Sequence, residues 1–228
     1  MEQAYYLYFY MIKNYVFVLA VAPILSGISA CNGNQQSLKA KQDNVQNGKI
    51  DETYNYECKE LGWKTSLPKD WNILTKQESE SLNERGKSAI EQSVGKKIDV
   101  SGLKELVNLK KDPYNTFIST MEAFNEKTDG KYEDKNKEVV ELIKDTYKSK
   151  GIKFDIKEGT EKIDGLEFYT IDMAIYTPGA DSKILMNQKM YNRLLNGNDF
   201  AMTITYNNPK DSTTQANIVY NSKFTIRN

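Results

Sequence analysis

The 228-residue sequence contains no histidine, and this absence excludes several kinds of chemistry. It excludes Ser-His-Asp and Cys-His nucleophile systems, every zinc site with a histidine ligand, and the commonest general base near neutral pH. Arginine is scarce as well, because only Arg85, Arg193 and Arg227 contribute to the 31 basic residues. The chain is therefore poorly equipped for bidentate recognition of phosphates or bases. The basic residues are balanced by 31 acidic ones, so no net charge attracts nucleic acid or an anionic membrane.

Cysteine is almost as scarce, since the sequence has only Cys31 and Cys58. Two cysteines cannot form a disulfide scaffold. Cys58 lies among charged residues and has no histidine to activate it, which is more typical of a structural thiol than of a nucleophile. Intermolecular pairing of Cys58 stays open. Hydrophobic residues make up 39% of the chain and aromatic residues 11%, which is enough for a core and excludes wholesale disorder.

The first 31 residues have the order of a secretory signal. Lys13 precedes an apolar run over residues 16–25, small residues follow, and Cys31 ends the segment. The run is shorter than the roughly 20 residues that a spanning helix needs, and it contains Pro23. Met11 heads a more usual signal peptide than Met1 does, so translation could start at either. The alternatives to a signal peptide are a buried N-terminal helix or an uncleaved anchor.

The tetrad Ile28-Ser29-Ala30-Cys31 resembles the lipobox of bacterial lipoproteins. This resemblance implies cleavage before Cys31, lipidation of its thiol with chains such as palmitate, and a body outside the cytoplasm. Stable anchoring requires two membrane-binding signals, and the several acyl chains of a lipoprotein supply more than two. No acidic cluster follows Cys31, so the membrane and leaflet stay open, with the periplasmic side of the outer membrane as the expected location.

Three regions follow from these observations and from composition. Residues 1–30 are predicted to be the signal peptide. Residues 31–55 are predicted to be the lipidated cysteine and a flexible tether, because the segment is polar, amide-rich and without periodicity. Residues 56–228 contain no linker-like break and no repeat, which favours one folded domain.

Within this domain, strand patterns alternate with single helices. Thr75 and Glu78 form a capping box that predicts a surface helix ending at Gly95. Apolar residues at a spacing of 3.6 predict a helix over residues 135–150, and Asn208-Pro209 predicts the start of another. Strands are predicted for residues 61–73 (two short strands joined by a proline turn), 103–111, 114–124, 152–157, 166–177, 183–195, 199–206 and 224–226.

The strands over residues 152–206 are expected to form an antiparallel meander, with tight turns at Asp164-Gly165 and Asn196-Gly197. The predicted fold class is therefore α+β, with a central antiparallel sheet and helices packed on its faces. One core face is expected to carry Tyr169, Ile171, Met173, Ile175, Ile184, Met186, Met190, Leu194, Phe200, Met202 and Ile204. Lys189 is assigned to neither face, so reversing its charge is expected to have only a small effect.

Residues 62–73 contain a spaced motif of an aromatic residue, a proline and a tryptophan. Four residues separate Trp63 from Pro68, and two separate Pro68 from Trp71. This opening is similar to that of PsbP-like domains, a family that includes PsbP of photosystem II, the Ran-binding Mog protein and many bacterial lipoproteins. The resemblance implies an α/β/α sandwich. Better-known members bind other proteins, and the family has no shared catalytic residues to transfer.

The expected function is accordingly a non-enzymatic accessory or protein-interaction module of the bacterial cell envelope, with an envelope protein as its partner. One alternative is a binder of a small hydrophobic or glycan ligand in a cleft between sheet and helix. A weaker alternative is a carboxylate-based hydrolase. No catalytic, cofactor or metal residue is predicted, and no cofactor or nucleic acid partner is expected, so the lipidated Cys31 is the one site residue.

Several residue types allow either a binding role or a structural one. Trp63 and Trp71 could line a groove, but aromatic residues beside a proline turn favour the core. Asp172 and Glu167 could pair for acid–base work, although their spacing does not single them out. Four methionines favour core packing over an adaptable surface: Met173, Met186, Met190 and Met202. Five tyrosines could form an exposed recognition patch: Tyr132, Tyr147, Tyr176, Tyr191 and Tyr206.

Overall fold

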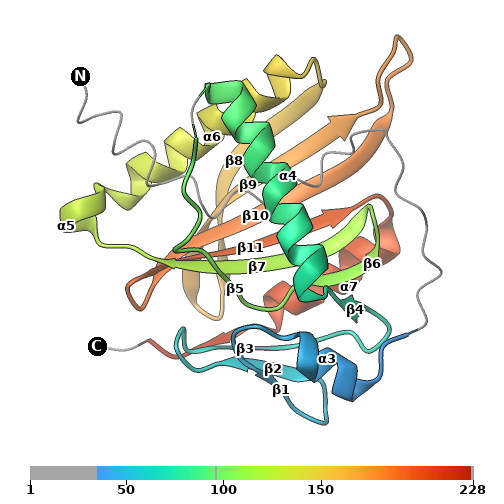
Figure 1. The fold of residues 1–228 in the computed structure, drawn as a ribbon, viewed down its shortest axis with the longest axis vertical. Helices are drawn as coiled ribbons and strands as arrows, with labels where there is room; N and C mark the ends of the chain where they lie inside the picture. Colours follow the sequence, from blue (N-terminus) through green and yellow to red (C-terminus); the bar gives the residue numbers. More distant parts are fainter. Residues whose placement is uncertain (1–34, 96, 227–228) are drawn as a thin grey trace.

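The computed structural model describes residues 35–95 and 97–226, which form two antiparallel sheets with helices around them (Figure 1). The large sheet contains β4 (Asn72–Ile73), β5 (Lys104–Glu105), β6 (Leu109–Asp112), β7 (Asn115–Ala123), β8 (Phe154–Ile163), β9 (Leu166–Tyr176), β10 (Ile184–Leu195) and β11 (Asn198–Tyr206). The small sheet contains β1 (Lys49–Ile50), β2 (Asn55–Cys58), β3 (Trp63–Ser66) and β12 (Lys223–Phe224). The helices are α3 (Leu38–Asn44), α4 (Lys76–Val94), α5 (Glu126–Asp129), α6 (Tyr132–Ser149) and α7 (Pro209–Tyr220).

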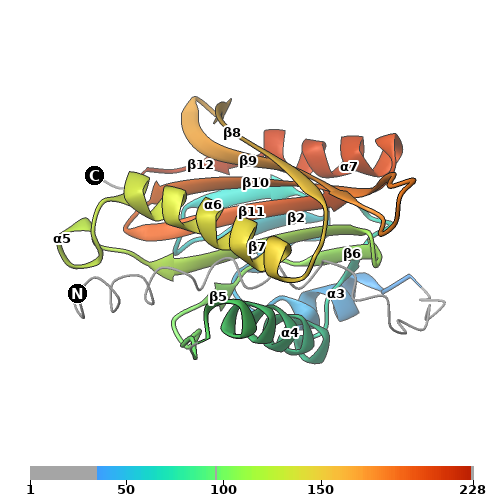
Figure 2. The ribbon, with the colours of Figure 1, turned by 90° about the horizontal axis from the view of Figure 1, so that it is seen from above.

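The strand order of the large sheet is β4-β6-β7-β11-β10-β9-β8, with β5 paired to β7, and the small sheet runs β1-β2-β3-β12. All of these pairings are antiparallel. Helices α4 and α6 lie on one side of the large sheet, and α7 lies on the other (Figure 2). The predicted α+β class, with a central antiparallel sheet and helices on its faces, is confirmed.

The meander from β8 to β11 forms as the turn residues predict. Asn196 and Gly197 have φ angles of 51° and 76°, and Asp164 and Gly165 have 49° and 78°. Two consecutive residues with positive φ match the twist of the adjoining strands, which is why Asn-Gly and Asp-Gly are favoured in such hairpins. The tight turn at Asn196-Gly197 is confirmed.

The prediction of one shared core face for this meander is wrong. Met202 of β11 pairs with Tyr191, whereas Met190 pairs with Thr203, so Met190 and Met202 point to opposite sides of the sheet. The apolar residues of β9 and β10 pack with α4 and α6: Ile171, Met173, Ile175, Met186 and Met190. Those of β11 pack with the small sheet and α7: Phe200, Met202 and Ile204. Ile184 is exposed, and Tyr169 and Leu194 are only half-buried.

The local signals for helices are confirmed. Helix α4 begins with the capping box, in which the Thr75 hydroxyl accepts from Glu78 N and the Glu78 carboxylate accepts from Thr75 N. It ends at Gly95, whose φ of 69° is left-handed. Helix α7 begins at Pro209, with Asn208 as its N-cap. Helix α6 begins at Tyr132, three residues before the predicted start.

Residues 35–55 do not form the predicted flexible tether. Ser37 caps helix α3, strand β1 pairs with β2, and Leu38, Val45 and Ile50 pack on the core beneath the small sheet. The Gln36 amide donates to Ile73 O and accepts from Ile73 N, at 2.9 and 2.8 Å, as a neighbouring strand would. Side-chain amides thus satisfy the edge of the large sheet, which is why a polar segment can be ordered.

The two strands predicted around Pro68 exist, but they belong to different sheets. Strand β3 pairs with β2 and β12 in the small sheet, whereas β4 pairs with β6 in the large one. Trp63 and Trp71 flank this crossing, and both side chains are fully buried. Among residues 35–95 and 97–226, no helix is both long and apolar enough to cross a membrane.

Candidate functional site

Of the two cysteines, only Cys58 lies in the described part of the chain. Cys31 lies outside it, so lipidation of Cys31 stays a prediction. Cys58 is buried in β2, and burial raises the pKa of its thiol. A buried thiol with a raised pKa is a poor nucleophile, as expected for a structural cysteine.

The tryptophans and methionines lie in the core rather than at a binding surface. Trp63 packs against Tyr56 and Phe200, with ring centroids 5.1 and 5.0 Å apart, and its indole donates to Ser222 Oγ at 2.9 Å. Trp71 is equally buried. The four methionines in question are at most 3% exposed: Met173, Met186, Met190 and Met202. The favoured core assignments are therefore confirmed.

The five tyrosines do not form one exposed patch. Tyr147 and Tyr191 are 1% exposed and lie in two different cores. Tyr132, Tyr176 and Tyr206 are half-buried and come from α6, β9 and β11. These tyrosines come from different elements and point to different faces of them, so they do not meet. The spacing of tyrosines in the sequence does not show which face each one occupies.

The carboxylates Asp172 and Glu167 do not form a pair. They lie five residues apart on β9, so their side chains point to opposite faces of the strand. Asp172 instead lies 3.3 Å from the ammonium of Lys189, which also pairs with Glu161. The Lys189 side chain is only 17% exposed and pairs with two carboxylates, so the structure favours a larger effect of reversing its charge than the sequence predicts.

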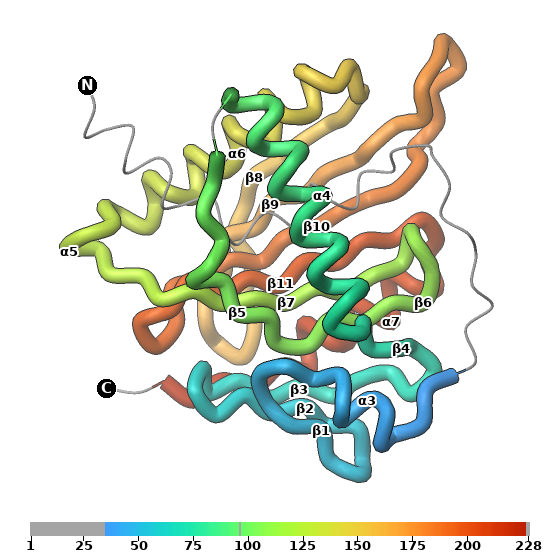
Figure 3. Tube along the Cα trace, viewed as in Figure 1, coloured from blue at the N-terminus to red at the C-terminus, as the bar shows by residue number. Residues whose placement is uncertain are grey.

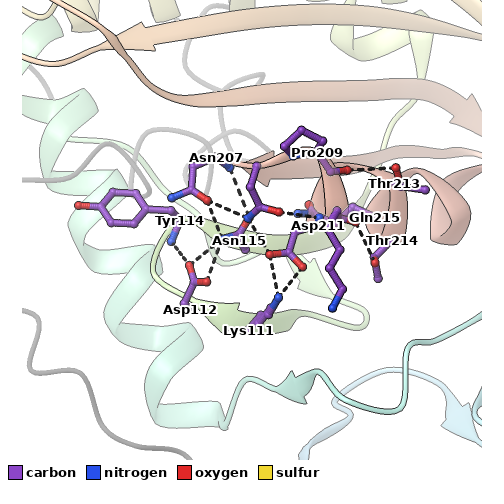
Figure 4. A network of polar contacts seen from close by, with 12 residues as sticks. Lys111, Asp112, Tyr114, Asn115, Asn207, Pro209, Asp211, Thr213, Thr214 and Gln215 are labelled. Atoms are coloured by element: carbon purple, nitrogen blue, oxygen red, sulfur yellow. Dashed lines mark hydrogen bonds and ion pairs between the residues drawn. The ribbon is translucent and has the colours of Figure 1, made fainter.

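A polar network joins the β6–β7 turn to the start of α7 (Figure 4). The Asn115 amide donates to both carboxylate oxygens of Asp112, at 2.9 and 2.8 Å, and to Asn207 Oδ1 at 3.0 Å. Asn208 donates to Asp211 at 2.8 Å, and Lys111 Nζ donates to both Asp211 oxygens at 2.7 and 2.9 Å. Figure 4 shows Asn115 between Asp112 of its own segment and Asn207 of the other.

This network is a structural junction rather than a reactive site. Asp211 is 3% exposed, and burial acts to raise its pKa, but hydrogen bonds from Lys111 and Asn208 outweigh burial and lower the pKa. The carboxylate is therefore a stable anion that fixes the first turn of α7. Farther along α7, the Gln215 amide donates to Thr205 O at 2.6 Å and accepts from Thr205 N at 3.0 Å.

A buried ion pair links the start of α6 to the start of β11. Lys135 Nζ contacts Asp199 Oδ2, and the two side chains are 1% and 0% exposed. The Tyr132 hydroxyl donates to the other Asp199 oxygen at 2.7 Å, and the Lys135 ammonium lies 4.9 Å from the centre of the Phe124 ring. Such a pair costs desolvation energy that only close geometry and added hydrogen bonds offset.

Two buried amides near this pair have unused hydrogen-bonding groups. Asn192 is 1% exposed, and neither its amide nitrogen nor its amide oxygen has a partner. Asn136 follows Lys135 in the buried stripe of α6, and its amide oxygen has no partner either. Asn192 lies two positions from Met190 on the sheet face that α6 covers. The α6–sheet interface thus changes from apolar to polar at this end. We call Asn136, Asn192 and the Lys135–Asp199 pair the α6 polar cluster.

A second buried carboxylate, Glu105, fastens the N-terminal segment to the body. It accepts from Gln46 at 2.8 Å, from Asn83 of α4 at 2.6 Å and from Asn108 at 3.1 Å. Burial raises the pKa of Glu105, and these hydrogen bonds act against that rise. Three elements that are distant in sequence therefore meet at one side chain.

Open hollows of modest size lie on the surface of the described part of the chain. One, of about 310 Å³, lies along the exposed side of α4 and is lined by residues that include Arg85 and Glu84. Another, of about 260 Å³, lies between residues 47–49 and 57–60. Within residues 35–95 and 97–226, no three His, Cys, Asp or Glu side chains are grouped so that they could hold a metal ion.

Comparison with known proteins gives matches among solved structures only. No protein-family model and no curated protein sequence matches the chain. Among solved structures, the chain is similar to the solution structure of cyanobacterial PsbP (CyanoP) from Synechocystis sp. PCC 6803. The two share 11% sequence identity and a TM-score of 0.46 over 87% of this chain and 98% of that one. The likeness concerns the fold alone.

Proposed function

We propose that this protein is a lipid-anchored module of the bacterial cell envelope that faces away from the cytoplasm and binds a partner without catalysing a reaction. The observation that carries the anchor is the sequence of a basic residue, an apolar run and small residues that ends in Ile28-Ser29-Ala30-Cys31. The absence of histidine supports a non-enzymatic role, because the commonest neutral-pH base is missing from the entire chain.

Substitution of Cys31 by serine tests the anchor. In wild-type cells we expect metabolic acyl labelling of the protein and its recovery in the membrane fraction. Cys31→Ser should abolish the label and either release the body or leave an unprocessed precursor. Cys58→Ser is the matched control, because it removes the buried thiol and should keep the label. Unchanged acyl labelling of Cys31→Ser would reject the anchor.

The binding role is tested by affinity capture from detergent-solubilised envelopes, with the acylated protein as bait. A specific envelope protein that is retained at matched detergent and salt, and is absent from a bait unfolded before capture, would support docking. Failure to enrich any envelope protein over the unfolded bait would count against a protein partner.

The α6 polar cluster favours a second candidate function, the binding of a small glycan-like ligand between sheet and helix. Buried polar groups in proteins are nearly always hydrogen-bonded, and Asn192 offers both a donor and an acceptor with no protein partner. Hydroxyl groups of a sugar match that set better than a hydrophobic ligand does. A panel of mono- and oligosaccharides should raise the melting temperature of the wild type but not of Asn192→Leu. No shift in melting temperature with any sugar would reject this candidate.

A further inference from the structure

We propose that the lipid anchor holds the α3 end of the domain directly against the membrane, so that this end is a fixed, lipid-facing surface. The surface consists of Ser37 and Lys39 of the α3 segment together with Lys69 and Asp70 of the neighbouring loop. This inference rests on the proposed anchoring at Cys31.

The first argument is the length of the connection. Only four residue steps separate Cys31 from Gln35, the first described residue. A fully extended chain spans at most about 3.6 Å per residue, so the Cα atoms of Cys31 and Gln35 can be no more than about 14 Å apart. A lipidated Cys31 lies at the membrane surface, and Gln35 must therefore lie within about 14 Å of it.

The second argument is that the chain is attached to the body from Gln35 onward. The Gln35 amide donates to Lys69 O at 2.8 Å, and Gln36 N donates to Asn72 Oδ1 at 2.9 Å. Lys41 Nζ also donates to Lys69 O, at 2.5 Å. A long flexible tether would let the folded domain move freely relative to the membrane, but here contacts with the domain begin at Gln35, four residues after the anchor.

Aromatic and acidic side chains strengthen this attachment. The ammonium groups of Lys41 and Lys69 lie 5.1 and 5.4 Å from the centre of the Tyr54 ring, so one ring holds the helix and the loop together. Farther along, Gln46 and Asn47 donate to the carboxylate and the carbonyl oxygen of Glu105. The segment cannot detach from the body without breaking contacts at both ends.

The third argument is the chemistry of the surface. Ser37, Lys39, Lys69 and Asp70 are all exposed and polar. Among the described residues, the exposed large apolar side chains are Ile184, Tyr220 and Ile226, and none belongs to this surface. The surface therefore suits contact with lipid headgroups, where lysine ammonium groups meet phosphates, and does not suit insertion among acyl chains.

This orientation leaves the opposite end of the molecule facing away from the membrane. Figure 3 shows α3 at one end of the longest axis and the hairpin between β9 and β10 at the other. Asp181, in that hairpin, is exposed. A partner in the aqueous compartment would therefore meet the β9–β10 hairpin before the small sheet.

Fluorescence quenching in vesicles tests the proposal with the full, acylated protein. Lys39→Cys and Asp181→Cys each introduce one accessible thiol for a fluorophore, since Cys31 is acylated and Cys58 is buried. The labelled proteins are placed in phosphatidylcholine vesicles that carry a spin label on the headgroup. We expect quenching at least threefold stronger at position 39 than at position 181.

A longer connection provides the control. An insert of about 20 Gly and Ser residues between Asn32 and Gly33 adds an average of about 25 Å of reach and should remove the difference between the two positions. Equal quenching in the acylated protein without the insert, or a difference that the insert leaves unchanged, would overturn the inference. Absence of acylation at Cys31 would instead reject the proposed anchor, so the two failures are distinguishable.

Discussion

Replacing Lys135 by methionine tests how the buried ion pair contributes to stability. The side chains of Lys135 and Asp199 are 1% and 0% exposed, so the substitution leaves a carboxylate in the interior without its ammonium partner. The Tyr132 hydroxyl still donates to Asp199, but a hydroxyl carries no charge to balance the anion. Removing one member of a buried pair costs about 3–5 kcal/mol. That is a large share of the roughly 5–15 kcal/mol that stabilises a typical domain.

Methionine is chosen because it keeps most of the lysine's length, so that a cavity contributes little to the measured loss. The free energy of unfolding is measured by urea titration with tryptophan fluorescence as the signal. Trp63 and Trp71 are both fully buried and should report exposure of the core. Changes in the urea midpoint at constant slope then report stability rather than a change in the denatured state.

Lys144→Met is the matched control on the same helix. Lys144 and Glu141 lie 2.7 Å apart at the surface, with side chains 27% and 63% exposed, and such pairs contribute at most about 1 kcal/mol. The double variant Lys135→Met/Asp199→Asn should recover much of the loss, because it removes the buried charge. A Lys135→Met loss no greater than that of Lys144→Met, or a double variant no better than the single one, would refute the reasoning.

Features that depend on a few neighbouring residues could be predicted from the sequence. The capping box of Thr75 and Glu78 and the turn at Asn196-Gly197 each require backbone geometry that those residues favour in any protein. The alternation along β9 and β10 correctly identified residues such as Ile171 and Met190 as buried. These signals are local, and the tertiary structure did not override them.

Burial of β11 on both faces could not be predicted. Thr203 and Thr205 look like the wet face of an alternating strand, yet they are 6% and 1% exposed. Whether a polar strand face is covered depends on elements far away in sequence. The prediction that β11 is buried on one face only was therefore wrong. It placed the apolar residues of β11 in the same core as those of β9 and β10, although the structure has two separate cores.

The N-terminal segment and the α6 polar cluster were missed for related reasons. Residues 35–55 are fixed in place by side-chain amides such as that of Gln36, which bonds to backbone groups 37 residues away. The composition of the segment does not indicate that such a distant partner exists. Lys135 occupies the same helical stripe as Val139 and Leu142, which was a usable signal for a buried, paired lysine. Its partner Asp199 is 64 residues away and could be found only once strand register was known.

Three further outcomes are expected in the same urea assay. Lys189→Asp places a third carboxylate beside Glu161 and Asp172 and should cost about 1–3 kcal/mol, more than Lys189→Met. Folding lowers the pKa of Asp211, so this carboxylate stabilises the folded state above about pH 4, and that stabilisation is lost as the pH falls. Asp211→Asn should therefore make the free energy of unfolding depend less on pH in acid. Gly62 and Gly165 have φ angles of 73° and 78°, so alanine at either should cost about 1–2 kcal/mol of backbone strain. At Gly62 a Cβ would also overlap a carbonyl oxygen of the C-terminal segment, whereas at Gly165 it would meet nothing within 4 Å. Gly62→Ala should therefore lose more stability than Gly165→Ala, and equal losses would mean that the C-terminal segment does not pack against the small sheet as described.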